Sequence, residues 1–113
     1  MYAVIFEVEP KPDGKAEYLD IAAALRQDLE KMDGFISIER FQSLTNEGKI
    51  LSLSFWRDEE AVVGWRNQSK HQKAQAKGYN ELFENYRLRI AEVQRDYTKT
   101  DRDEAPQETP APT

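Results

Sequence analysis

The chain of 113 residues contains no cysteine and a single histidine, His71. Without cysteine there can be no disulfide, no iron–sulfur cluster, no Cys-ligated zinc and no thiol nucleophile. With one histidine, metal sites that need two imidazoles from the same chain are excluded, HExxH among them. No GxSxG motif indicates a serine nucleophile elbow. The inventory leaves a small acidic domain with very few reactive side chains.

The sequence also lacks a strongly basic stretch and a long apolar run. The net charge is −5, and residues 101–113 hold four carboxylates against Arg102, so the rest of the chain is close to neutral. Nucleic-acid binding is usually marked by a basic stripe, which is missing. No apolar segment approaches the ~18 residues of a membrane span, and no signal-peptide pattern follows Met1. We expect a cytoplasmic protein that binds neither nucleic acid nor a membrane.

Alternating apolar and polar residues predict strands, and apolar residues spaced three or four apart predict helices. The expected elements, in order, are a strand over 2–9, a helix over 14–32, strands over 35–43 and 50–57, a helix from 58 to 78, and a last strand over 86–97. The two middle strands flank a glycine-containing loop, so they should form an antiparallel hairpin.

The ends and continuity of the helices depend on a few polar residues. Asp13 is a candidate N-cap for the first helix and Asp58 for the second. Residues 69–72 have the form of a capping box, which predicts that the second helix breaks and restarts near 67–69. On an unbroken helix, positions 65 and 71 differ by about 240° of rotation. A break would allow Trp65 and His71 to face one cavity.

The order β-α-β-β-α-β is that of the ferredoxin-like α+β fold, a four-stranded antiparallel sheet with two helices on one face. We expect one domain over 1–98 and an acidic, proline-containing tail over 99–113 that is disordered on its own. Strands one and three carry apolar residues on both faces, whereas a sheet with one solvated face should alternate cleanly. This pattern predicts a homodimer whose sheets pair into an α/β barrel. The alternative is a monomer that tolerates scattered exposed apolar residues.

Few side chains offer chemistry. Trp65 lies in the middle of the second helix, where tryptophan most often packs in the core. His71 could act as a base, because imidazole can hold either protonation state near neutral pH, or it could lie in solvent. Arginines on strands could bind an anionic or enolate-like ligand, or pair with nearby glutamates. The candidates for substrate binding are Trp56, Arg40, Tyr86 and Arg87.

Several segments resemble the antibiotic biosynthesis monooxygenase family, and the resemblance covers about residues 2–98. The segments are 34–41, 51–56, 58–61, 65–67 with His71, and 86–91. The resemblance implies a dimeric α+β barrel. It also implies a monooxygenase that uses O₂ without a cofactor or a metal, as do relatives that convert polyketide anthrones to quinones. Trp65 and His71 would then lie in the pocket, with His71 removing a proton from a small aromatic or enolisable substrate.

Two other functions stay open within the resemblance. The family's pocket asparagine would fall at position 61, where this chain has Ala61, which favours a non-catalytic ligand-binding or stress-response module. Haem-degrading members would place their axial histidine at position 75, where this chain has Gln75. Their strand-one asparagine is also missing from 2–9. Haem degradation is therefore the least favoured function.

Overall fold

A computed structural model describes the backbone of residues 1–75 and 79–106 and the side chains of residues 1–69 and 81–106. The elements are β1 (Tyr2–Pro10), α1 (Lys15–Glu30), β2 (Phe35–Gln42), β3 (Ile50–Trp56), α2 (Glu59–Gln75), a 3₁₀ turn η1 (Tyr79–Leu82) and β4 (Phe83–Glu92). This order confirms the predicted ferredoxin-like α+β fold.

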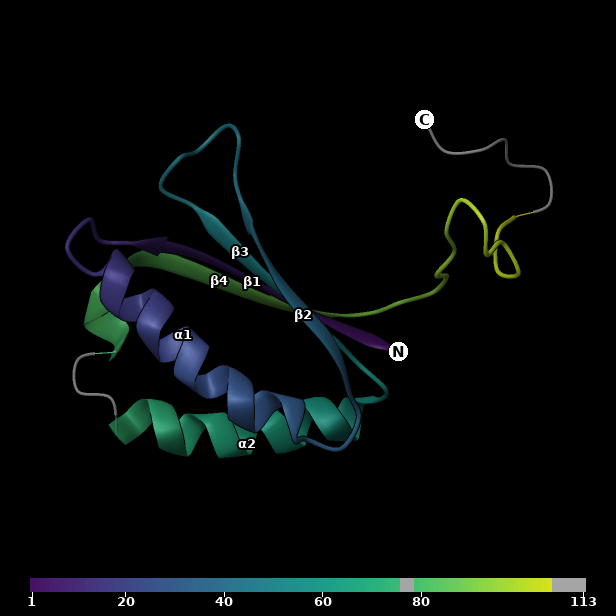
Figure 1. The fold of residues 1–113 in the computed structure, drawn as a ribbon, viewed down its shortest axis with the longest axis horizontal. Coiled ribbons are helices and arrows are strands. Elements are labelled where there is room, and N and C mark those ends of the chain that lie inside the picture. Colours follow the sequence, from purple (N-terminus) through teal and green to yellow (C-terminus); the bar gives the residue numbers. More distant parts are fainter. Residues whose placement is uncertain (76–78, 107–113) are drawn as a thin grey trace.

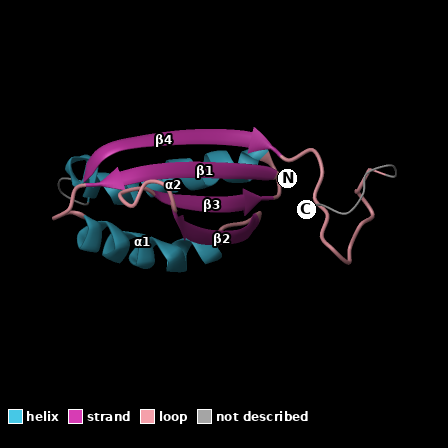
Figure 2. Cartoon of the chain, turned by 90° about the horizontal axis from the view of Figure 1, so that it is seen from above, coloured by secondary structure: helices cyan, strands magenta, loops and turns pink. Residues whose placement is uncertain are grey.

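The strands form one antiparallel sheet with the order β2-β3-β1-β4, so β2 and β4 are its edges. Both helices lie on the same side of the sheet (Figures 1 and 2). Val8, Ile50 and Trp56 point toward the helices and are buried. Ile5 and Leu53, which pair with each other in the register, lie on the opposite face, and no described element covers it. We call this second surface the open face.

The core between the sheet and the helices consists of two clusters at opposite ends of β1. The phenylalanine cluster contains Val8, Tyr18, Ile50 and Phe83, with Phe6 and Leu82 packed against it. The tryptophan cluster contains Leu29, Trp56, Ala61 and Val62, with Tyr2, Val4, Met32, Phe35, Ile38 and Trp65 packed against it. Tyr2 and Val8 are six residues apart on β1, so the cluster centres are separated by about 20 Å.

The predicted break in the second helix is wrong. The backbone of α2 is helical without interruption from Glu59 to Gln75. Ser69 does not begin a new helix, because its hydroxyl donates to the carbonyl of Arg66 at 3.3 Å within the same helix. Its side chain is buried, with 4% of the residue exposed. The serine therefore satisfies its hydroxyl by bonding back to the preceding turn, an alternative to capping.

The two predicted caps have different outcomes. Asp58 caps α2, since its carboxylate accepts a hydrogen bond from the backbone N–H of Ala61 at 2.9 Å. Asp13 does not cap α1, because Gly14 is the N-cap residue and no side chain bonds there. A side chain at position 14 would meet the carbonyl oxygen of Leu82, since an added Cβ would lie 2.9 Å from it. The close approach of η1 therefore places glycine at the start of α1.

The last strand begins and ends earlier than predicted. β4 runs from Phe83 to Glu92 and pairs only with β1. Its partner begins at Tyr2, so the ladder has no residues to pair with beyond that point. The last bond joins the N–H of Val93 to the carbonyl of Met1 at 2.9 Å. The start of β1 therefore sets the end of β4.

Candidate active site beside a tryptophan pair

Two indole rings meet between the sheet and α2. Trp56 ends β3 and Trp65 lies in the second turn of α2, and their ring centroids are 6.3 Å apart with planes inclined by 25°. Trp56 is completely buried, and its Nε1–H donates to the hydroxyl of Ser54 at 2.9 Å. Trp65 is only half-buried. The fixed ring of Trp56 therefore holds a second ring that keeps part of its surface accessible.

Tyr2 is a residue of this region that the sequence did not single out. It packs against the tryptophan cluster and pairs with Trp56 across the β1–β3 ladder. The negative charge of Glu92 raises the pKa of the Tyr2 phenol, with smaller contributions from burial and from Glu59. The phenol therefore keeps its proton and remains a hydrogen-bond donor. The sequence indicated this position of Tyr2 only through strand alternation, which places Tyr2 on the same face of the first strand as Val4.

Arg40 is a half-buried cation on the helix-covered face of β2. It pairs in the register with Ser52, which lies on the same strand face as Ser54 and Trp56. The Nε–H of Arg40 is buried and has no hydrogen-bond partner in the described part of the chain. A buried donor without a partner is costly, and a guanidinium binds a carboxylate strongly. Arg40 therefore has free capacity to bind an anionic oxygen.

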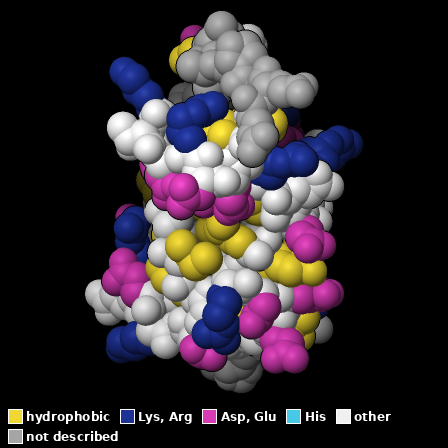
Figure 3. Space-filling model, turned by 90° about the vertical axis from the view of Figure 1, so that its right-hand side faces the viewer, with side chains coloured by type: hydrophobic (Ala, Val, Ile, Leu, Met, Phe, Trp, Pro, Cys, Tyr) yellow, Lys and Arg dark blue, Asp and Glu magenta, His cyan; other side chains and the backbone are white. Residues whose placement is uncertain are grey.

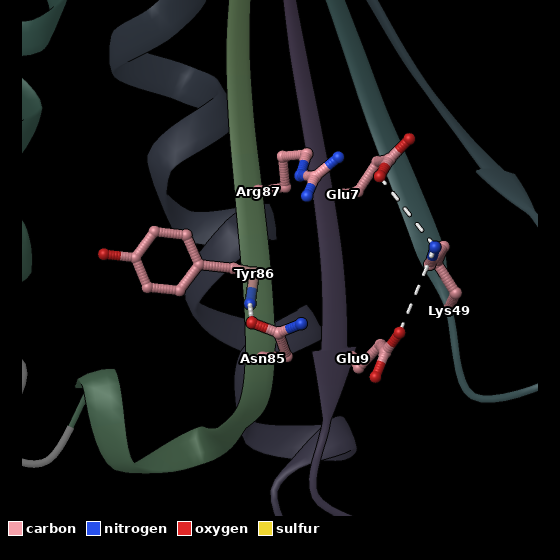
Figure 4. Close-up of a pocket in the computed structure, with 6 residues that line it drawn as sticks. All are labelled: Glu7, Glu9, Lys49, Asn85, Tyr86 and Arg87. Carbon is pink, nitrogen blue, oxygen red and sulfur yellow. Dashed lines mark hydrogen bonds and ion pairs between the residues drawn. The ribbon is translucent and has the colours of Figure 1, made fainter.

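Tyr86 and Arg87 lie on opposite sides of β4 (Figure 4). The Tyr86 ring belongs to the phenylalanine end of the molecule, with its centroid 5.9 Å from that of Phe6 and 6.1 Å from that of Phe83. Arg87 lies on the open face beside Glu7, its partner in the register. The structure thus brings neither residue to the tryptophan pair.

The open face carries a polar hollow of about 200 Å³. Its lining residues are Glu7, Glu9, Lys49, Asn85, Tyr86 and Arg87. The Lys49 Nζ lies 3.9 Å from a Glu7 oxygen and 4.0 Å from a Glu9 oxygen, and all three side chains are about one-third exposed (Figure 4). Long, solvated ion pairs of this kind contribute little to the free energy of unfolding. The hollow has the properties of a charged surface and not of a closed reaction site.

His71 lies in α2, six residues after Trp65, and its side chain is outside the described residues. The continuous helix restores the rotation of about 240° between positions 65 and 71. The break that was expected to bring these two side chains together is thus absent.

An ion-pair network fixes the start of α2 and therefore the position of Trp65. Two nitrogens of the Arg57 guanidinium donate to Asp33 at 3.1 and 2.9 Å, and its Nε donates to Asp58 at 3.1 Å. The hydrogen bonds and charge of Arg57 hold the pKa of Asp33 below its usual value. The pKa of Asp58 is lowered first by the Ala61 N–H and then by Arg57.

Arg57→Gln is expected to lower Tm near neutral pH and to have less effect in acid. Both aspartates have depressed pKa values in the folded chain, so they stabilise it above the unfolded pKa of about 4 and lose that contribution as pH falls through the folded values. Melting curves from pH 2 to pH 7 followed by circular dichroism measure the effect. Arg26→Gln, which breaks an exposed pair with Glu30 within α1, is the matched control. An Arg57→Gln deficit that is the same at every pH would contradict the assignment.

Within the described residues, no group of three His, Cys, Asp or Glu side chains is arranged to hold a metal ion. No helix in that part of the chain is long and apolar enough to cross a membrane.

Comparisons with known proteins agree on one family. Residues 1–77 match the family model described as antibiotic biosynthesis monooxygenase. The chain is 50% identical over 93 residues to a protein from Pyricularia oryzae named jasmonate monooxygenase ABM, covering 82% of this chain but 43% of that protein. It is 30% identical over 94 residues to the uncharacterized protein YqjZ of Bacillus subtilis, covering 83% of this chain and 80% of that one.

Solved structures share the fold at low sequence identity. The structure of Rv0793 from Mycobacterium tuberculosis matches with a TM-score of 0.74 at 18% identity, covering 86% of this chain and 98% of that one. A variant of SnoaB, a cofactor-independent oxygenase from Streptomyces nogalater, matches with a TM-score of 0.70 at 12% identity, covering 84% and 94%.

Proposed function

The chain belongs to the antibiotic biosynthesis monooxygenase family, and from that premise we propose that it oxygenates a small aromatic or enolisable compound with O₂ beside Trp65. One observation carries the proposal: the completely buried Trp56 supports a Trp65 ring that is still partly accessible. A ring-shaped substrate can stack on such a surface. The stacking of Trp56 on Trp65 also supports the proposal, because both residues were singled out from the sequence as candidate site residues.

Arg40 adds a preference for a substrate with a carboxylate. Ser52, its partner in the register, and Trp56 are four residues apart on β3, so the Cα atoms of these two residues are separated by about 13 Å. A ring bearing a short acidic chain can span this interval. Jasmonate, which the Pyricularia relative is named for, combines an enolisable cyclic ketone with a carboxylate. We therefore propose a substrate of that chemical class, with the carboxylate bound by Arg40.

The proposed reaction converts an activated CH₂ group into a carbonyl. A base removes one proton, and the resulting carbanion transfers an electron to O₂. Recombination gives a peroxide, which loses water and leaves the C=O group. The four electrons lost by carbon reduce O₂ to the carbonyl oxygen and one water molecule, so no other reductant is consumed.

We assign the base to His71, and we propose that the Tyr2 hydroxyl donates a hydrogen bond to the developing enolate oxygen. The assignment to His71 rests on its being the single histidine and on the family resemblance at that spacing, and not on the helix geometry, which places positions 65 and 71 on different faces of α2. The charge of Glu92 raises the pKa of the Tyr2 phenol, so this hydroxyl keeps its proton and can serve as a hydrogen-bond donor.

We also propose that the working form is a homodimer in which a second copy covers the open face. Ile5, Leu51, Leu53 and Phe55 share that face and are only half-buried in the single chain, and Phe41 is 42% exposed. A contiguous apolar surface of this kind is typical of an interface.

Oxygen uptake with jasmonic acid and with a hydroxyanthrone tests the function, and the substrate class is tested with Arg40→Gln. This variant is expected to raise KM for the acid about 10- to 100-fold, the value of a charged hydrogen bond, and to leave KM for the methyl ester unchanged.

His71→Ala is expected to lower kcat about 100-fold or more. Arg26→Gln is the control. If His71→Ala matches the wild type, the base is another residue, and if no such compound consumes oxygen, the oxygenase proposal fails.

The second candidate function is a ligand-binding module without turnover. Ala61 supports it, because the position where relatives carry an asparagine is here a buried methyl group facing Gly34. That role predicts that aromatic acids raise Tm without consuming oxygen, so the two measurements together separate the functions.

A further inference from the structure

The chain continues beyond β4 as an arm, residues 93–106, which extends away from the sheet and helices (Figure 1). The Val93 N–H, bonded to Met1, marks the point where the arm leaves the sheet. Beyond Val93, every hydrogen bond in the described part of the arm joins two of its own residues. The described hydrogen bonds of the arm beyond Val93 therefore hold its local structure without joining it to the sheet or the helices of the same chain.

That structure is a turn held by a few bonds. The Thr98 N–H donates to the Asp101 carbonyl at 2.7 Å, and the Asp101 N–H donates to the Thr98 hydroxyl at 2.8 Å. The Arg102 guanidinium lies 5.2 Å from the centre of the Tyr97 ring. Fixing the backbone of one residue costs about as much as one exposed hydrogen bond returns, and the arm has fewer such bonds than residues. The hydrogen bonds within the arm therefore do not offset the conformational entropy lost when the arm is ordered, and contacts with another surface are needed to stabilise it.

An unpartnered surface of matching kind lies on β4, which is an edge strand. Tyr86, Leu88 and Ile90 form the β4 row, an apolar row on the helix side of the sheet, exposed by 55%, 49% and 42%. Edge strands also present unpaired backbone N–H and C=O groups that accept another strand. Figure 3 shows the end of the molecule from which the arm leaves, where hydrophobic side chains gather in the middle with charged ones around them.

We propose that the arm of one chain wraps around the β4 edge of a second copy and covers the β4 row of that copy. The arm of the second copy covers the β4 row of the first chain in the same way. This inference rests on the proposed homodimer and is independent of the proposed reaction. Residues 93–98, which precede the turn, can reach about 20 Å when extended, whereas the ten residues of β4 span about 33 Å. The arm can thus follow a little more than half of the strand before its turn begins.

The direction of the arm favours a second copy over its own strand. Folding back onto its own β4 row would need a reversal just after Glu92, and residues 93–98 contain no turn or bend. An antiparallel path along the second β4 places the root of the arm near Ile90 and its tip near Arg87.

Charge supports the same path. The tip, residues 101–104, carries three carboxylates against Arg102. Arg87 has no ion pair within the described residues, and Arg89 is held only by Glu7, at 3.6 Å. These arginines lie on the open face of β4, opposite the β4 row, so an arm that wraps around the edge can bring its acidic tip to them.

Crosslinking between copies tests the inference, and the cysteine-free chain makes it clean. Leu88→Cys and Tyr97→Cys chains are made separately, mixed through mild denaturant, and treated with a short bis-maleimide. We expect a product of twice the chain mass, well above that from Leu44→Cys mixed with Tyr97→Cys, since Leu44 is 97% exposed on the β2–β3 loop. A yield equal to that control would overturn the proposal. So would a chain carrying both cysteines that closes only on itself.

Truncation provides a second measurement that does not depend on cysteine placement. Ending the chain after Val93 is expected to weaken the dimer at least tenfold by sedimentation equilibrium, compared with ending it after Pro106. An unchanged dimer without crosslinks would refute the arm and leave the homodimer standing. A full-length chain that stays monomeric would refute both, while oxygen uptake still judges the reaction separately.

Discussion

Trp56→Ala is expected to lower the free energy of unfolding by about 3–5 kcal/mol, the usual cost of truncating a large buried aromatic side chain. Trp56 is completely buried, and its ring packs edge-on against Phe35 at 5.4 Å between centroids and stacks on Trp65. The truncation leaves a cavity beneath Trp65 and an unpaired hydroxyl at Ser54. Urea unfolding followed by far-UV circular dichroism measures the loss.

Two further variants separate packing from hydrogen bonding at this position. Trp56→Phe keeps an aromatic ring but removes the donor to Ser54, so it should cost about 1–3 kcal/mol. Ser54→Ala leaves the indole N–H without its acceptor and should cost a similar amount. A loss below about 1 kcal/mol for Trp56→Ala would mean that this ring is not a core element, and the support it gives to Trp65 would be refuted.

Gly34→Ala is the second change with a large expected effect, about 2–5 kcal/mol. Gly34 has φ +86°, a left-handed conformation that costs a residue with a side chain about 1–2 kcal/mol. An added Cβ would also lie 2.5 Å from the Cβ of Ala61, and relieving such overpacking costs about 1–3 kcal/mol. The same chemical-denaturation measurement applies.

The neighbouring alanine allows the two contributions to be separated. Ala61→Gly alone should cost about 1 kcal/mol through lower helix propensity. In the double variant the steric conflict is gone while the backbone strain remains, so we expect a favourable coupling energy of about 1–3 kcal/mol, equal to the cost of the overpacking. Strict additivity would show that α2 does not press on the α1–β2 turn. Because α2 carries Trp65, Gly34→Ala should also lower turnover, and by more than alanine substitutions at neighbouring exposed residues do.

Much of the fold could be predicted from the sequence because the periodic signals agree with local chemistry. The alternation in β1 and β3, the glycine-containing loop between β2 and β3, and the Asp58 cap each specify their element without help from distant residues. The break in α2 was predicted from a local capping pattern. It failed because Ser69 is buried by tertiary packing, and a buried hydroxyl is satisfied by the carbonyl of Arg66 within its own helix.

The candidate site was harder to predict, because strand register decides which side chains meet. Nothing in the local sequence around Trp56 and Trp65 indicates that their rings stack. The separation of Tyr86 from Arg87, in contrast, follows from strand alternation, since neighbouring strand residues point to opposite faces. The free capacity of Arg40 depends on which groups happen to surround its guanidinium, and only the packed chain shows that.

The tryptophan pair also gives the protein an internal optical reporter. The chain has two tryptophans, and both belong to the stacked pair. Their emission therefore comes entirely from this one region, with no background from elsewhere in the fold. Trp65 is the ring that a quencher in solution can reach, while Trp56 is shielded. Ligand occupancy beside the pair should thus be readable by quenching of the unlabelled, unmodified chain.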